Sequence, residues 1–163
     1  SLLPRTSAYD QACDDARARL AAFLAHDGYG TATAIEKMYR TQRDIEGETV
    51  HLSGKLDAVL EQNGKARIVD FKTSTTVRGH EEDYQLQLAF YDYLLQENGE
   101  SPSGVSIIQV RTDGVEEFPV PLTDEFKSEF LITLDTVLTE MLSGKWRPAK
   151  EPSPYYDLLK LFA

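Results

Sequence analysis

The chain has 163 residues, 41% of them hydrophobic and 27% charged, which is typical of one globular domain with a proper core. Its net charge of −10 argues against a free-standing domain that holds nucleic acid by bulk electrostatics. The apolar runs are too short to span a membrane. Cys13 is the single cysteine, which excludes disulfides and cysteine-built zinc or iron–sulfur sites and favours a reducing, cytoplasmic compartment.

The first predicted element is a helix from Ser7 to about His26. Ser7 and Asp10 resemble a capping box at its start, and Asp27-Gly28 is a stop signal at its end. Apolar side chains that recur at helical spacing are expected to face the core: Ala12, Ala16, Leu20, Phe23 and Leu24.

Three antiparallel strands are predicted next: Ile35–Ile45, Val50–Leu60 and Ala66–Thr73. Residues 46–48 form the turn between the first two. Asn63-Gly64, between the second and third, is the strongest short-range signal for a two-residue hairpin turn of type I′. A polar loop that carries Arg78 and His80 follows the third strand.

The second half of the chain predicts two further helices around a second hairpin. One helix runs from about Asp83 to Glu97, and another begins at the cap residue Thr123 and ends at Gly144. The strands between them are expected at Val105–Arg111 and Glu116–Val120, around the turn Asp113-Gly114. The core-facing side chains are expected to be Leu86, Phe90, Tyr93 and Leu94 on the first of these helices and Phe126, Phe130, Leu134, Val137, Leu138 and Met141 on the second. A tail from Lys145, which includes Trp146, completes the chain.

The order α-β-β-β-α-β-β-α predicts an α/β fold of the mixed α+β kind, in which helices flank a central mixed β-sheet. No internal repeat or linker divides the sequence, so residues 1–163 are expected to form a single domain. Ser1 and Leu2 are compatible with an expression scar.

The hairpin around Asn63-Gly64 carries the clearest candidate site. If these two residues form the loop, Gln62 lies opposite Lys65, and the same register places Asp57 opposite Asp70. Alternation along the strand places Lys72 on the same face. Two carboxylates about 5 Å apart at Cβ repel each other, and a divalent cation is the obvious compensation.

Two interpretations of this hairpin remain open from spacing alone. In the first, Asp57 and Asp70 hold a hard cation such as Mg²⁺, and Lys72 orients or deprotonates a water for phosphodiester hydrolysis. In the second, the hairpin is an ordinary solvated surface on which Lys55 and Lys72 offset the two aspartates. Aspartate is disfavoured within strands, and Val69 and Phe71 indicate a buried opposite face, so the pattern modestly favours a site.

Three stretches in order, Gly54-Lys-Leu-Asp57, Ile68-Val-Asp-Phe-Lys-Thr73 and Tyr84-Gln-Leu-Gln-Leu-Ala-Phe-Tyr91, resemble the RecB-like branch of the PD-(D/E)XK nuclease superfamily. The chain looks most like the C-terminal nuclease module attached to UvrD-type helicases. The resemblance implies a restriction-endonuclease-like core and a C-terminal piece of a longer helicase–nuclease. It also implies a metal-dependent deoxyribonuclease, expected to be an exonuclease in DNA repair and recombination, whose partners are DNA and an ATP-dependent helicase domain or subunit.

The resemblance also assigns roles to individual residues. Asp57 and Asp70 match the metal-binding acids, and Lys72 matches the water-activating lysine. The backbone carbonyl of Phe71 would be a further ligand for Mg²⁺ or Mn²⁺. Two residues at i and i+4 on the following helix, Gln87 and Tyr91, match a signature that contacts the DNA backbone or braces the lysine. Glu36 matches a glutamate of the preceding strand that supports the metal site, and an ordinary edge-strand charge is the alternative.

The chain departs from that family pattern in two ways. Many nucleases of this branch have an upstream helical histidine at the metal site, and no such Gly-x-x-x-His pattern occurs here. His26 is expected to cap a helix end, while His51 and His80 fall on a strand and in a loop. Some relatives also carry C-terminal cysteines for an iron–sulfur cluster, and this tail has none, so no cluster is expected. The alternative function is therefore a catalytically incomplete nuclease-like module that guides DNA or binds a partner.

Overall fold

The computed structural model describes residues 7–26, 28–73, 77, 79 and 84–145, which form three helices and five strands. Arg78, His80, Trp146 and the tail beyond Lys145 lie outside the described residues. No helix within the described ranges is long and apolar enough to cross a membrane. The elements in chain order are α1 (Ser7–Leu24), β1 (Thr31–Ile45), β2 (Glu48–Gln62), β3 (Lys65–Lys72), α2 (Gln85–Glu97), β4 (Val105–Val110), β5 (Val115–Val120) and α3 (Asp124–Leu142).

Two tight turns join the first three strands into the predicted antiparallel meander. Both central residues of each turn have positive φ, at 51° and 88° for Glu46-Gly47 and at 55° and 73° for Asn63-Gly64. This is the requirement of the type I′ turn, whose twist matches that of the strands it joins. The turns are where the sequence places them, although β1 begins at Thr31, four residues before the predicted start.

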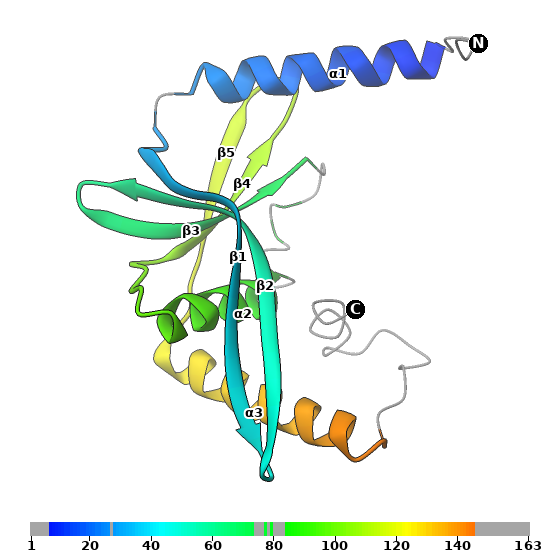
Figure 1. Cartoon of the computed structure of the whole chain (residues 1–163). Helices are drawn as coiled ribbons and strands as arrows, with labels where there is room; N and C mark the ends of the chain where they lie inside the picture. The colour runs from blue at the N-terminus through cyan, green and yellow to red at the C-terminus, as the bar shows by residue number, and fades with distance from the viewer. Residues whose placement is uncertain (1–6, 27, 74–76, 78, 80–83, 146–163) are drawn as a thin grey trace.

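The sheet has the order β1-β2-β3-β4-β5, in which only the β3–β4 pair is parallel. A parallel neighbour requires a crossover connection, and α2 lies within it. Helices α2 and α3 lie on the same side of the sheet, where the long β1–β2 ribbon extends past them (Figure 1). The predicted mixed sheet with flanking helices is therefore confirmed.

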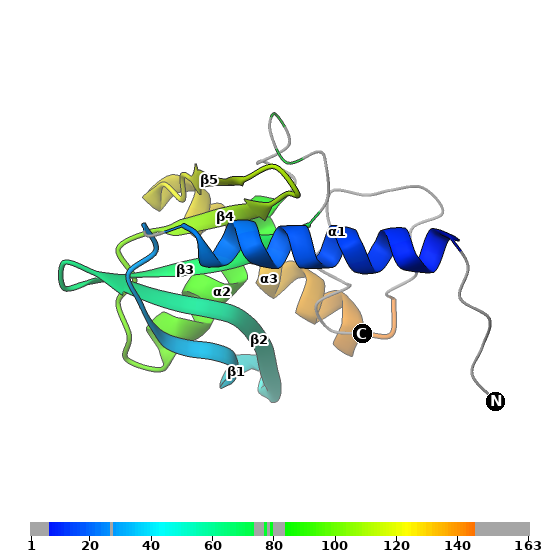
Figure 2. The ribbon, with the colours of Figure 1, turned by 90° about the horizontal axis from the view of Figure 1, so that it is seen from above.

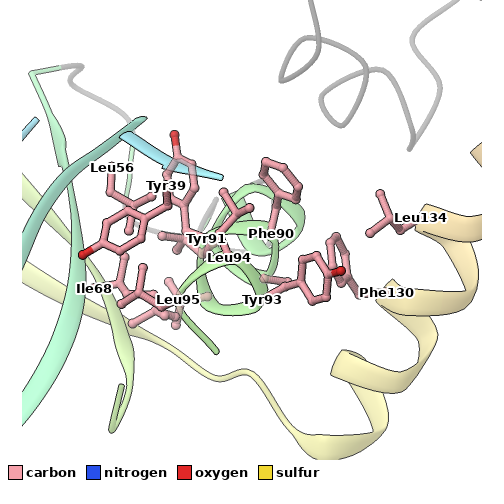
Figure 3. Packing of buried hydrophobic residues seen from close by; sticks show 14 of the residues in the cluster. Tyr39, Leu56, Ile68, Phe90, Tyr91, Tyr93, Leu94, Leu95, Phe130 and Leu134 are labelled. Atoms are coloured by element: carbon pink, nitrogen blue, oxygen red, sulfur yellow. The ribbon is translucent and has the colours of Figure 1, made fainter. Parts of the chain in front are cut away.

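Helix α2 is buried over most of its circumference, because the sheet and the β1–β2 ribbon enclose it on one side and α3 packs on the other. Its residues 88 to 95 are all buried, a wider face than the predicted stripe. The side chains of Phe90, Tyr93 and Leu94 pack between the strands and the α3 residues Phe130 and Leu134 (Figure 3).

Helix α3 begins as predicted, since the Thr123 side chain accepts a hydrogen bond from the Phe126 backbone N–H at 3.1 Å. Four of its predicted core residues are buried, and Phe126 is partly buried. Met141 is 39% exposed, so its assignment to the core is wrong. Residues 140–145 at this end of the helix are all exposed within the part of the chain that the structure describes.

The predicted core face of α1 is wrong. Ala12, Ala16, Leu20 and Leu24 are exposed, and only Phe23 of the predicted stripe packs inward. The C-terminal part of α1 lies over the sheet face opposite α2, beside β3 and β4, and the rest of the helix projects beyond the ends of these strands (Figures 1 and 2). A helix that covers the sheet with only one of its ends touches it at one short segment, so periodicity along the whole helix does not report burial.

Candidate active site

Strand β3 brings Asp70, Phe71 and Lys72 to the middle of the sheet. Its neighbours β2 and β4 cover both its edges, and successive side chains point to opposite faces. Val69 and Phe71 pack in the apolar cluster on the α1 side, as the sequence predicts. Asp70 therefore points to the opposite face, toward α2, where it is only 3% exposed.

The hairpin register is the predicted one, but the ladder stops one residue before the two aspartates face each other. The observed pairs run from Gln62↔Lys65 to Ala58↔Val69, after which Asp70 pairs only with Ile107 of β4. The register therefore agrees with the predicted one, and the Asp57–Asp70 position lies just beyond the last ladder pair. At this position the Asp57 carboxylate accepts a hydrogen bond from the Phe71 backbone N–H, with a distance of 2.9 Å from Phe71 N to Asp57 Oδ2.

Asp70 and Lys72 form a close ion pair, with 2.7 Å between Lys72 Nζ and Asp70 Oδ2. The pair does not give that oxygen a hydrogen bond of good geometry, and among the described residues the buried Oδ2 has no hydrogen-bond partner. Burial raises the pKa of Asp70 above its ordinary value, the ion pair with Lys72 opposes this, and the nearby charge of Asp57 adds to it. Burial of Asp70 thus opposes its ionisation more than the ion pair with Lys72 favours it.

Helix α2 places Gln87 and Tyr91 together, as their i, i+4 spacing predicts. Gln87 Nε2 donates to the Tyr91 hydroxyl at 2.9 Å. Burial is the main cause that raises the pKa of Tyr91, and the charges of Asp70 and Asp57 raise it further while Lys72 lowers it. The Tyr91 hydroxyl therefore lies within electrostatic reach of the two acids and the lysine.

Gly54 explains how α2 comes this close to β2. A Cβ atom on Gly54 would lie 2.7 Å from Leu94 Cδ1, 3.3 Å from Phe90 Cε1 and 3.4 Å from Tyr91 Cε1. A side chain at this position, three residues before Asp57, would displace the side chains through which the helix packs against the strand.

Tyr84 is a site neighbour that sequence reasoning did not single out. It occupies the N-cap position of α2 without a side-chain capping hydrogen bond, and its ring centre lies 5.0 Å from Lys72 Nζ. The face of an aromatic ring attracts a cation, so this contact helps to hold the ammonium group beside Asp70. The sequence offers one signal, namely that Tyr84 directly precedes the helix that carries Gln87 and Tyr91.

Glu36 is not brought into the group around Asp70. It lies in β1 at the position that the register places opposite Asp57, with a φ of 51° that interrupts the regular ladder. Its side chain is 60% exposed and forms an ion pair with Lys55, whose pKa is raised mainly by that contact and slightly by Asp57. The ammonium group of Lys55 therefore compensates the negative charge of Glu36 directly and that of Asp57 only at longer range.

Two histidines can be placed, and neither joins the acids. His26 lies just beyond the end of α1, and its ring centre is 4.4 Å from that of Tyr29. His51 lies in β2, where it is exposed and has its Nδ1 3.4 Å from Gln42 Nε2. Across the described ranges, no three His, Cys, Asp or Glu side chains gather into a group that could hold a metal ion.

The residues present nevertheless fit a hard divalent cation of the kind that the sequence resemblance implies. Such cations are often held by only one or two carboxylates, with substrate oxygens and water as the other ligands. Asp70 offers a buried oxygen with no hydrogen bond, and the partly buried Asp57 carboxylate is near enough to influence its pKa. The backbone carbonyl of Phe71 belongs to the residue between Asp70 and Lys72, where the sequence analysis expects a further ligand.

Comparison with known proteins identifies the family. No curated protein sequence matches the chain. The crystal structure of SSO0001 is similar at 17% sequence identity and a TM-score of 0.45; the match covers 66% of this chain and 50% of that one, so the chain spans about half the length of that protein. The family model of the PD-(D/E)XK nuclease superfamily matches residues 4–153. The mixed sheet and element order agree with the restriction-endonuclease-like fold, and the chain belongs to the PD-(D/E)XK nuclease superfamily.

Proposed function

We propose that the chain is a metal-dependent deoxyribonuclease module in which Asp57, Asp70 and Lys72 form the reactive site. The observation that carries the proposal is the buried Asp70 oxygen, which lies beside Lys72 and near Asp57 yet lacks a hydrogen bond. A buried carboxylate whose pKa is raised by burial despite a lysine partner is typical of functional sites, and a cation bound there would stabilise its ionised form. Membership of a nuclease superfamily supports the same chemistry.

Each residue of the proposed site has a distinct task. Asp57 and Asp70, with the carbonyl of Phe71, would hold Mg²⁺ or Mn²⁺. The cation, when bound, supplies stabilisation of negative charge on the phosphate and leaving oxygen and makes water more acidic. Lys72, held between Asp70 and the Tyr84 ring, would orient the attacking water with its ammonium group. Gln87 and Tyr91 would brace this arrangement or contact the DNA backbone.

The wider role also follows as a proposal. The order of the three motifs supports the RecB-like branch, in which the module works as an exonuclease beside an ATP-dependent helicase in DNA repair or recombination. The net charge of −10 is consistent with a module whose affinity for DNA depends largely on such a partner. The single cysteine, Cys13, is consistent with a reducing, cytoplasmic compartment. Glu36, which pairs with Lys55 at the rim, would support the acids only indirectly.

The test is cleavage of labelled linear DNA in Mg²⁺ by the full chain and by Asp70→Asn, with covalently closed DNA as the substrate that an exonuclease leaves intact. We expect Asp70→Asn to lose cleavage by about 10³-fold or more, a loss typical of removing a group that acts on the transition state. Asp92→Asn is the matched control, because Asp92 is equally buried at 3% and also lies 2.7 Å from a lysine Nζ, that of Lys127.

The two variants separate chemistry from folding. Cleavage retained by Asp70→Asn would overturn the proposed site. A wild-type chain that is folded and binds Mn²⁺ but never cleaves DNA would instead favour the alternative, a nuclease-like module that guides DNA or binds a partner.

A further inference from the structure

Helix α1 reaches the candidate site through one side chain, Arg19. Its Nη1 atom donates two hydrogen bonds, to the Thr73 carbonyl at 2.6 Å and to the Val110 carbonyl at 2.8 Å. Thr73 directly follows β3, and Val110 is the last residue of β4. The same guanidinium nitrogen therefore joins the ends of the two parallel strands.

The Arg19 contact lies immediately beyond the end of the β3–β4 ladder. Its last pair is Lys72↔Gln109, so Thr73 and Val110 are the next residues along each strand. Val110 is still held by its pair with Val115 of β5, but Thr73 lies beyond the end of β3, and such a strand end frays unless another donor replaces the missing hydrogen bonds. Arg19 supplies that donor one residue after Lys72.

A second contact from the same helix fixes the residue on the other side of Lys72. Phe23 lies one turn after Arg19, and its ring packs edge-on against Phe71, with 5.4 Å between ring centres and 85° between planes. Phe23 also stacks on Tyr29 at 5.1 Å, which anchors it in the apolar cluster on this face. Helix α1 thus holds the two chain neighbours of Lys72, while Lys72 itself points to the other face of the sheet.

We propose that Arg19 is a positioning residue of the site, which fixes the end of β3 so that Asp70 and Lys72 stay aligned with Asp57. The expected effect of Arg19 on DNA cleavage rests on the proposed nuclease function. Its effect on the end of β3 does not. The Phe71 amide reports directly on how β3 is held, because its backbone N–H donates a hydrogen bond to the Asp57 carboxylate.

The test compares three variants of the full chain. Arg19→Met keeps the unbranched stem and removes the donors, and Arg19→Lys returns an ammonium donor. Arg17→Met is the matched control, since Arg17 is on the same helix, has a side chain that is 79% exposed and pairs only locally with Asp14 at 3.0 Å. Both methionine variants remove one positive charge, so a general loss of attraction for DNA affects them equally.

The first measurement uses neither metal nor DNA. Hydrogen exchange of the Phe71 amide, followed by NMR, is expected to be roughly tenfold faster in Arg19→Met than in Arg17→Met, and to slow again in Arg19→Lys. The amide of Ile107, a fully buried residue in the middle of β4, should exchange at the same rate in all variants and thereby reports an intact core. Equal Phe71 exchange in Arg19→Met and Arg17→Met would overturn the inference.

The second measurement is DNA cleavage. Misplacement of catalytic groups by about 1 Å costs up to 10²-fold, so Arg19→Met should lower kcat by about 10- to 100-fold with little change in KM for DNA. An unchanged kcat alongside faster Phe71 exchange would overturn the catalytic role. If the wild-type chain does not cleave DNA while Phe71 exchange responds as expected, the proposed function fails and the structural role of Arg19 stands.

Discussion

Asp70 combines a buried side chain with a pKa that is raised above its ordinary value. Because burial raises its pKa, the folded chain binds a proton at Asp70 more tightly than the unfolded chain does. The contribution of Asp70 to stability is therefore fully present below its ordinary pKa of 3.8 and is lost as the pH rises through the folded-state pKa. Ionisation of Asp70 therefore lowers the free energy of unfolding relative to that of the chain with Asp70 protonated.

This predicts that Asp70→Asn, in the absence of metal, is more stable than the wild-type chain at pH 7 by about 0.5–2 kcal/mol, the usual scale of relief at a functional site. The difference should shrink as the pH falls through the folded-state pKa of Asp70. Urea unfolding at a series of pH values checks this. Asp92→Asn should lose stability instead, because Asp92 Oδ2 accepts a hydrogen bond from Gln96 and pairs with Lys127. A wild-type chain more stable than Asp70→Asn at pH 7 would contradict this view of Asp70.

Tyr91 carries a prediction of its own, because its hydroxyl is the partner of Gln87 beside the acids. Tyr91→Phe should cost about 1 kcal/mol of stability, the net value of one hydrogen bond, and should reduce cleavage roughly tenfold if Gln87 braces the site. Tyr93→Phe is the control on the same helix, since its hydroxyl contacts Arg43 rather than the acids. Urea unfolding and initial cleavage rates distinguish the two, and equal cleavage by both variants would remove Tyr91 from the site.

At the scale of elements, the close packing of α2 on β2 depends on Gly54. Gly54→Ala would place a Cβ atom 2.7 Å from Leu94 Cδ1, so the fully buried Leu94 side chain or the helix that carries it must shift, which should cost about 1–3 kcal/mol. Gly104→Ala is the control, because nothing lies within 4 Å of the added Cβ and the backbone there is not left-handed. Thermal melting of both variants tests the contact. Similar melting temperatures would show that α2 and β2 are not held at this distance.

The sequence predicts elements well where the signal is local. The turn at residues 46–48, the type I′ turn at Asn63-Gly64, the Thr123 cap and the register of the β2–β3 hairpin depend on residues a few positions apart, and all are found in the structure. The exposed stripe of α1 and the end of the β2–β3 ladder just before Asp57 depend on contacts between distant segments. Arg19, which is 54 and 91 residues from its two partners, had no sequence signal for the same reason.

At the scale of the whole molecule, the candidate site assembles from three elements around one end of β3. Strand β2 supplies Asp57, β3 supplies Asp70 and Lys72, and α2 supplies Gln87 and Tyr91. Spacing within the hairpin and within α2 could be read from the sequence. The approach of α2 to the hairpin is a property of the β3–α2–β4 crossover, and only the family resemblance anticipated it.

The most direct test of the central claim is calorimetric titration of Mn²⁺ into the full chain. If Asp57 and Asp70 share a cation, the wild-type chain binds Mn²⁺, Asp70→Asn binds it at least about tenfold more weakly, and Asp92→Asn binds it as the wild type does. Such binding should also raise the melting temperature of the wild-type chain, and EDTA should reverse that increase. Mn²⁺ affinity that is the same in Asp70→Asn and in the wild-type chain would contradict the account.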